Sequence, residues 1–220
     1  MPELTPDLLV FGFIWYIAFL FSTTCHEASH ALVATLGGDD TAERGGQVTL
    51  NPMPHIRREP WGMVVIPILS FVLAQRMIGW ASAPFNPDWE RRYPRRAAWM
   101  ALAGPAANFT LMFAAALLLR IGFRSDWFAL GANGQIGMLE AVLTAFYRLN
   151  LLLGCFNLLP FPPLDGSAGI MALMPIQTAH SYLDWLRATP YRSLGLLIAI
   201  LGFRYVYGPI EKYANYYLLR

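Results

Sequence analysis

Charged residues and cysteine are scarce in this chain. Only 14% of its 220 residues are charged and 56% are hydrophobic, which is far from the usual composition of a soluble domain. The two cysteines, Cys25 and Cys155, show no CxxC spacing and cannot form a disulfide framework. No basic tract with interleaved aromatics is present and the net charge is +2, so we expect no nucleic-acid partner.

The first residues also lack the basic region of a secretory signal. The segment MPELTPD carries acidic residues and no base, whereas a signal peptide starts with positive charge and ends at a small-residue cleavage site. We therefore expect the first apolar segment to be retained in the folded protein.

Apolar residues are gathered in blocks long enough to cross a bilayer, which takes about 20 helical residues. One block, at 61–81, is different from the long blocks given below. It contains Pro67 and the polar pair Gln75-Arg76, which favours a broken or re-entrant helix. The sequence predicts an all-α polytopic membrane protein with about four to six membrane-embedded helices. The long blocks lie at 8–36, 97–123, 136–159 and 193–208.

We expect one integral-membrane domain over residues 1–220, with a motif-bearing core at about 8–175 and a C-terminal helix at about 193–208. A short strand is expected where polar and apolar residues alternate from Gln47 to Leu50.

Loop charge predicts the orientation in the cell membrane. Cytoplasmic loops are enriched in Arg and Lys, and the 38–60 and 82–96 loops carry several Arg, whereas the 122–135 loop carries only Arg124. This pattern places the N-terminus outside, and Gly37 and Asp165 near the cytoplasmic face. Both basic loops can lie on one side only if the 61–81 block dips into the membrane and returns.

The first apolar block contains the pattern HExxH, as His26-Glu27-Ala28-Ser29-His30. Residues four apart share one helix face, so the two imidazoles can converge on one zinc ion. Glu27 is then placed to accept a proton from water at the metal. The alternative is a pair of core histidines bonded to backbone carbonyls. An ionisable side chain deep in a bilayer costs roughly 2.5–3.5 kcal/mol or more, and a shared cation offsets that cost for all three residues.

A catalytic zinc usually has a third protein ligand, and the segment after His30 supplies no further histidine. The candidates are Glu140 and Asp165. A helix from residue 140 to 157 rises about 25 Å, so the two acids cannot share one depth. Asp165 is favoured because it lies in a Pro-rich, non-helical stretch, and irregular backbone at membrane depth is tolerated where it lines a cavity.

Several motifs in this order resemble the site-2 protease family of intramembrane zinc metalloproteases, in particular compact prokaryotic members without a PDZ or CBS domain. They are HEASH, LNPMPHI, GWASAPFNP, GPAAN at 104–108 and FNLLPFPPLDG at 156–166. The resemblance covers about residues 10 to 170. It implies one zinc ion per chain held by His26, His30 and Asp165, with Glu27 as catalytic base and Asn157 near the scissile carbonyl.

The resemblance implies an endopeptidase that cuts membrane-protein substrates within or near their transmembrane helices, with the zinc site toward the cytoplasmic side. The alternatives are a transporter or channel using intramembrane His and Glu, and an inactive metal-binding scaffold. Asn157 could instead cap a helix or join two helices. Asn108 is interpreted as packing glue between helices. His55 could substitute as a metal ligand, but we favour a surface-loop residue. The sequence does not give the oligomeric state.

Overall fold

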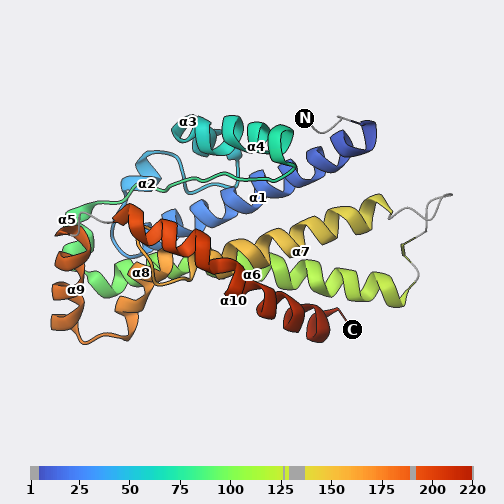
Figure 1. Cartoon of the computed structure of the whole chain (residues 1–220). Helices are drawn as coiled ribbons and strands as arrows, with labels where there is room; N and C mark the ends of the chain where they lie inside the picture. The colour runs from blue at the N-terminus through green and yellow to red at the C-terminus, as the bar shows by residue number, and fades with distance from the viewer. Residues whose placement is uncertain (1–4, 126, 129–136, 189–191, 220) are drawn as a thin grey trace.

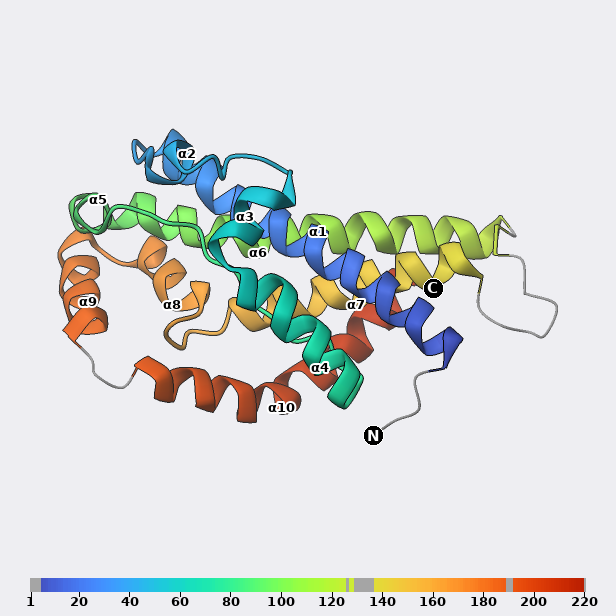
Figure 2. The ribbon, with the colours of Figure 1, turned by 90° about the horizontal axis from the view of Figure 1, so that it is seen from above.

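The computed structural model describes residues 5–125, 127–128, 137–188 and 192–219. Four long helices run in alternating directions along the molecule (Figures 1 and 2). Each is long and apolar enough to cross a membrane, which confirms the prediction of an all-α polytopic membrane protein. These helices are α1 (Pro6–Leu36), α6 (Pro94–Arg124), α7 (Met138–Asn157) and α10 (Arg192–Leu218).

Helices α1, α6 and α7 begin and end close to the predicted block limits. Thr5 caps α1 by accepting a hydrogen bond from the backbone N–H of Leu8 at 3.3 Å, and Pro6 occupies the first turn, where its missing N–H costs nothing. The helix ends at Gly37, followed by Gly38 with φ of 96°. Ile136, where the fourth block was predicted to begin, and most of the 122–135 loop lie outside the described residues.

Short helices connect the long ones. They are α2 (Thr41–Arg44), α3 (Pro52–Arg58), the π-helix η1 (Trp61–Val65), α4 (Ile66–Ala74), α5 (Pro87–Arg92), α8 (Asp165–Gly169), the 3-10 helix η2 (Ile170–Leu173) and α9 (Ile176–Ala188). Most of them gather at the end of the molecule where α1 finishes and α6 starts (Figure 1).

The predicted strand at Gln47–Leu50 is wrong, and no strand forms anywhere in the described ranges. The Asn51 side chain accepts a hydrogen bond from the N–H of Met53 at 3.0 Å, which starts α3 with Pro52 in its first turn. Thr49 Oγ1 accepts from the N–H of Asn51 at 3.1 Å. Strong capping and turn signals therefore outweigh an alternation only four residues long.

The 61–81 block forms a broken element, as predicted. The helical part, Trp61–Ala74, is shorter than a span and ends at Gln75, whose backbone is left-handed with φ of 53°. The chain then runs extended from 76 to 86 back toward α5 (Figure 1). This return brings both Arg-rich loops to the same end of the molecule.

Helices α1, α6 and α7 pack against one another. The α1 and α6 ends are joined through the carbonyl oxygen of Gly37, which accepts hydrogen bonds from Trp89 Nε1 and from Arg96, both at 3.0 Å. One buried cluster joins α6 to α7 through Met112, Ala115, Ala116, Leu119, Tyr147 and Leu151. This three-helix unit positions the polar residues described below.

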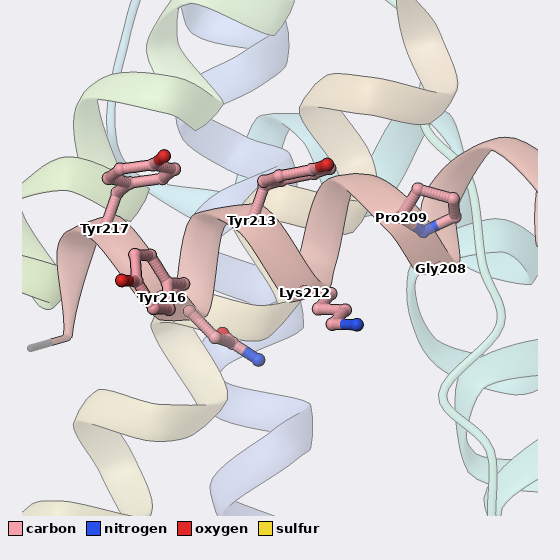
Figure 3. A pocket seen from close by; sticks show the side chains of 7 residues that line it. Gly208, Pro209, Lys212, Tyr213, Tyr216 and Tyr217 are labelled. Atoms are coloured by element: carbon pink, nitrogen blue, oxygen red, sulfur yellow. The ribbon is translucent and has the colours of Figure 1, made fainter.

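Helix α10 is longer than the predicted helix at about 193–208. The helix continues through Pro209 to Leu218, and Tyr147 donates a hydrogen bond to Asn215 Oδ1 at 3.0 Å. In the most apolar stretch of α10, only 6% of the residues are buried by the rest of the protein. A hollow along its C-terminal part is lined by residues of α10 alone, among them Lys212, Tyr213 and Tyr217 (Figure 3), so it is separate from the HExxH residues.

Candidate metal centre

The HExxH residues lie on the buried face of α1. His26, Glu27 and His30 are 6%, 5% and 7% exposed, in a helix otherwise made of apolar and small residues. The Nε2 atoms of His26 and His30 are 2.9 Å apart, with the two rings nearly perpendicular at 84°. The helix therefore brings two metal-binding nitrogens together, as the spacing predicts.

Asp165, at the start of α8, comes to the same point from a segment distant in the sequence. Its Oδ2 atom lies 3.0 Å from His26 Nε2 and 3.4 Å from His30 Nε2. This oxygen is buried and has no hydrogen-bond partner among the described residues. The Pro-rich loop after α7 delivers it at the first residue of α8. A Cβ on the next residue, Gly166, would overlap the carbonyl of Leu158, so only glycine permits this tight approach.

The distances among these atoms fit a zinc site. Ligand atoms placed tetrahedrally at about 2.0–2.1 Å from zinc are separated by about 3.3 Å, near the observed 2.9, 3.0 and 3.4 Å. The orphaned Asp165 oxygen is explained if a cation, rather than a proton, lies between the three atoms. His26, His30 and Asp165 therefore form a donor set with the composition and spacing that zinc requires.

The charge state of Asp165 agrees with this role. Burial raises the pKa of Asp165, but the neighbouring His30 and His26 lower it by more, so the pKa lies below its usual range. The carboxylate is therefore ionised at neutral pH, as a metal ligand must be.

Gly104 on α6 makes room for the two imidazoles. A Cβ at this position would overlap the Nε2 atoms of both His26 and His30. The absence of a side chain at Gly104, in the GPAAN motif, therefore leaves the space that the two rings occupy. Position 104 forms one wall of the centre.

The second nitrogen of each ring is also engaged. His30 Nδ1 donates to the carbonyl oxygen of Met100 at 2.7 Å, and His26 Nδ1 lies 2.6 Å from Asn108 Oδ1. Interpreting Asn108 as packing glue alone was therefore incomplete. Asn150, which contacts Asn108 in turn, was not recognised in the sequence, although an isolated amide in an apolar helix is itself a signal.

Glu27 lies beside the histidines. Its carboxylate and the ring nitrogens of His26 and His30 offer three ligand atoms within 4.8 Å of one another. This arrangement allows the Glu27 carboxylate to reach a water molecule held by the same cation. Glu27 is thus placed to accept a proton from that water, which is the role that the HExxH pattern gives to its glutamate.

The other candidates lie outside this group. Asn157 is half-buried at the last residue of α7 and makes no hydrogen bond to His26, His30 or Asp165. Glu140 is in the first turn of α7, at the end away from Asp165. The prediction that His55 lies in a surface loop is wrong. It is in α3, 1% exposed, and its Nε2 donates to the carbonyl of Thr49 at 3.1 Å.

Four apolar helices of spanning length, together with a buried His-Glu-His group and an adjacent aspartate, define a multi-pass membrane protein with a candidate metal centre. The chain is 35% identical over 162 residues to the Bacillus subtilis (strain 168) protein named "Putative zinc metalloprotease YwhC", covering 72% of this chain and 68% of that one. It is 30% identical over 190 residues to "Putative zinc metalloprotease Rip2" of Mycolicibacterium smegmatis, covering 86% and 66%.

No protein-family model and no solved structure gives a significant match. The chain spans about two thirds of the length of each of the two relatives. At this identity and coverage, the chain belongs to the site-2 protease family of zinc metalloproteases.

Proposed function

We propose that this protein is an intramembrane zinc-dependent endopeptidase that cuts membrane-protein substrates within or near their transmembrane helices. The observation that carries the proposal is the convergence of His26 Nε2, His30 Nε2 and Asp165 Oδ2 within 3.4 Å. The centre is enclosed by helices of spanning length. One zinc ion per chain would occupy it.

Zinc bound there supplies Lewis acidity, which brings the pKa of water to about 7 and polarises a peptide carbonyl. Glu27 accepts the proton of the attacking water and then delivers it to the leaving amine. The low exposure of the centre strengthens each of these electrostatic interactions. The Asn157 amide would donate a hydrogen bond to the oxygen that becomes negative during attack.

The Asp165 loop and the end of α1 lie toward the end of the molecule that carries the Arg-rich loops (Figure 1). Because Arg-rich loops favour the cytoplasm, we place the zinc site toward the cytoplasmic side of the cell membrane. A substrate helix must unwind before its carbonyls become accessible, since helical carbonyls are already hydrogen-bonded.

The test compares the purified protein with Glu27→Gln, using zinc analysis and cleavage of a membrane-embedded model substrate. We expect the variant to retain zinc and to lose about 10²–10⁴-fold in cleavage rate. Ser29→Ala is the matched control, because its hydroxyl only bonds the Cys25 carbonyl at 2.8 Å in the same helix. If Glu27→Gln cleaves like the wild type, or if the wild type holds zinc and cleaves no membrane substrate, the proposal fails.

A further inference from the structure

Three helices share a chain of buried hydrogen bonds that ends at His26. Asn108 on α6 lies with Oδ1 2.6 Å from His26 Nδ1 on α1, and its Nδ2 donates to Asn150 Oδ1 on α7 at 2.8 Å. Asn150 Nδ2 donates both to Ser22 Oγ on α1 at 2.8 Å and to the carbonyl oxygen of Phe146 at 2.9 Å. Asn108 and Asn150 are each 0% exposed.

The carbonyl oxygen of Phe146, at the end of this hydrogen-bond series farthest from His26, fixes which atom of each amide donates. A backbone carbonyl can only accept a hydrogen bond, so Asn150 must turn its NH₂ group toward Phe146 and its oxygen toward Asn108. Asn108 must then present NH₂ to Asn150 and oxygen to His26. Since an amide oxygen cannot donate, His26 must carry its proton on Nδ1. In the neutral ring, Nε2 then keeps its lone pair, which is directed at Asp165 and His30.

We propose that Asn108 and Asn150 are positioning residues that hold His26 in the Nδ1–H tautomer and so prepare Nε2 to bind metal. This inference rests on the proposed metal centre. His30 obtains the same tautomer from the Met100 carbonyl, a backbone group of fixed polarity. His26 has an amide instead, which could rotate to present either atom, and Asn150 removes that freedom although it does not touch the histidine.

A role in packing alone predicts something different. Polar side chains between membrane helices stabilise association by roughly 0.6–2 kcal/mol whichever way their amides point. In that case, a substitution at Asn150 would weaken the fold without altering which nitrogen of His26 holds the proton. The tautomer of His26 therefore separates the two roles.

The experiment measures two quantities that need no substrate. The first is the tautomer of His26 in zinc-free protein at alkaline pH, from ¹⁵N NMR of labelled histidine side chains. The second is the zinc dissociation constant, from competition with a chelator. The variants are Asn150→Leu, Asn108→Leu and Asn108→Asp. Thr24→Val is the control, because Thr24 is 1% exposed in the same helix as His26, and its hydroxyl has no hydrogen-bond partner among the residues that the structure describes.

We expect Asn108→Leu to weaken zinc binding about 10–100-fold, the effect typical of a lost partner of a ligating histidine. Asn108→Asp keeps an acceptor facing His26 but loses the NH₂ group that donates to Asn150 Oδ1, so it should restore part of the affinity that Asn108→Leu loses. Asn150→Leu should produce a mixture of His26 tautomers and a smaller loss of affinity in the same direction. Thr24→Val should match the wild type in both measurements.

Unchanged zinc affinity in Asn108→Leu, or a pure Nδ1–H tautomer in Asn150→Leu, would overturn the proposal. If Asn150→Leu does not fold, Asn150→Ala replaces it. The zinc affinities of Asn108→Leu and Asn108→Asp test the proposal independently of either Asn150 variant. A protein that binds zinc and responds as expected here, yet cleaves no substrate, would contradict the proposed protease function while leaving this role of the two amides intact.

Discussion

Asp165 Oδ2 lies 3.0 Å from His26 Nε2, although one residue opens a short helix after α7 and the other lies inside α1. The contact is made through a loop that contains a cis peptide bond between Pro162 and Pro163 and a glycine with no room for a side chain. The candidate centre therefore forms only by tertiary contact between two distant segments, and substitutions can test each segment separately.

Asp165→Ala should remove one of the three proposed ligands. We expect its zinc dissociation constant to rise by more than the roughly 10–100-fold that loss of a second-layer partner costs. Metal content of the purified variant, determined by elemental analysis, checks this. Asp40→Ala is the control, because Asp40 is exposed and pairs only with Arg44. Equal metal content in the Asp165→Ala variant and the wild type would reject Asp165 as a ligand.

Gly104→Ala should displace the two imidazoles, because the added Cβ overlaps both Nε2 atoms. Overpacking of this kind typically costs about 1–3 kcal/mol of stability, and here we expect weaker zinc binding as well. Chelator competition measures the zinc affinity. Gly202→Ala is the matched control, since a Cβ there meets no atom within 4 Å. A Gly104→Ala protein with wild-type zinc affinity would contradict the tight geometry described for this wall.

Asn157→Ala tests the predicted oxyanion donor. Loss of one such donor reduces kcat by about 10²–10³-fold, and zinc content should stay unchanged because Asn157 makes no hydrogen bond to the histidines or Asp165. Steady-state cleavage of a model substrate supplies kcat and KM. If kcat is unaffected, Asn157 serves as an ordinary end-of-helix amide.

Removal of zinc should destabilise the protein. A ligand that binds only the folded state at 100 times its Kd contributes about 2.7 kcal/mol, so chelation should lower the unfolding temperature. Thermal unfolding in detergent, with and without a chelator, measures this shift. The same chelator should leave Asp165→Ala nearly unaffected, because that variant would already lack tightly bound metal. A shift of equal size in both proteins would show that the chelator acts elsewhere.

Local patterns predicted the features that depend on one segment. The HExxH spacing needs only helical geometry, so the meeting of His26 and His30 follows from the sequence. Asp165 required a further argument, that a Pro-rich stretch ends at membrane depth, and the structure places it beside the histidines.

The features that sequence reasoning missed depend on contacts between segments. Asn150 gains its role from α6 and α1, and nothing in α7 alone identifies those partners. His55 is buried because α3 packs on α1, which the loop-like composition around it does not reveal. The prediction of a strand at Gln47–Leu50 was wrong because Asn51 caps the start of α3, and this signal outweighs four residues of alternating polar and apolar character.

The long separation between His30 and Asp165 along the chain has a consequence for biosynthesis. During translation, α1 enters the membrane with its two imidazoles while the carboxylate that completes the donor set has not yet been made. The half-made protein would thus be unable to hydrolyse its neighbours in the insertion machinery, and competence would arise only once α8 has emerged and folded back onto α1.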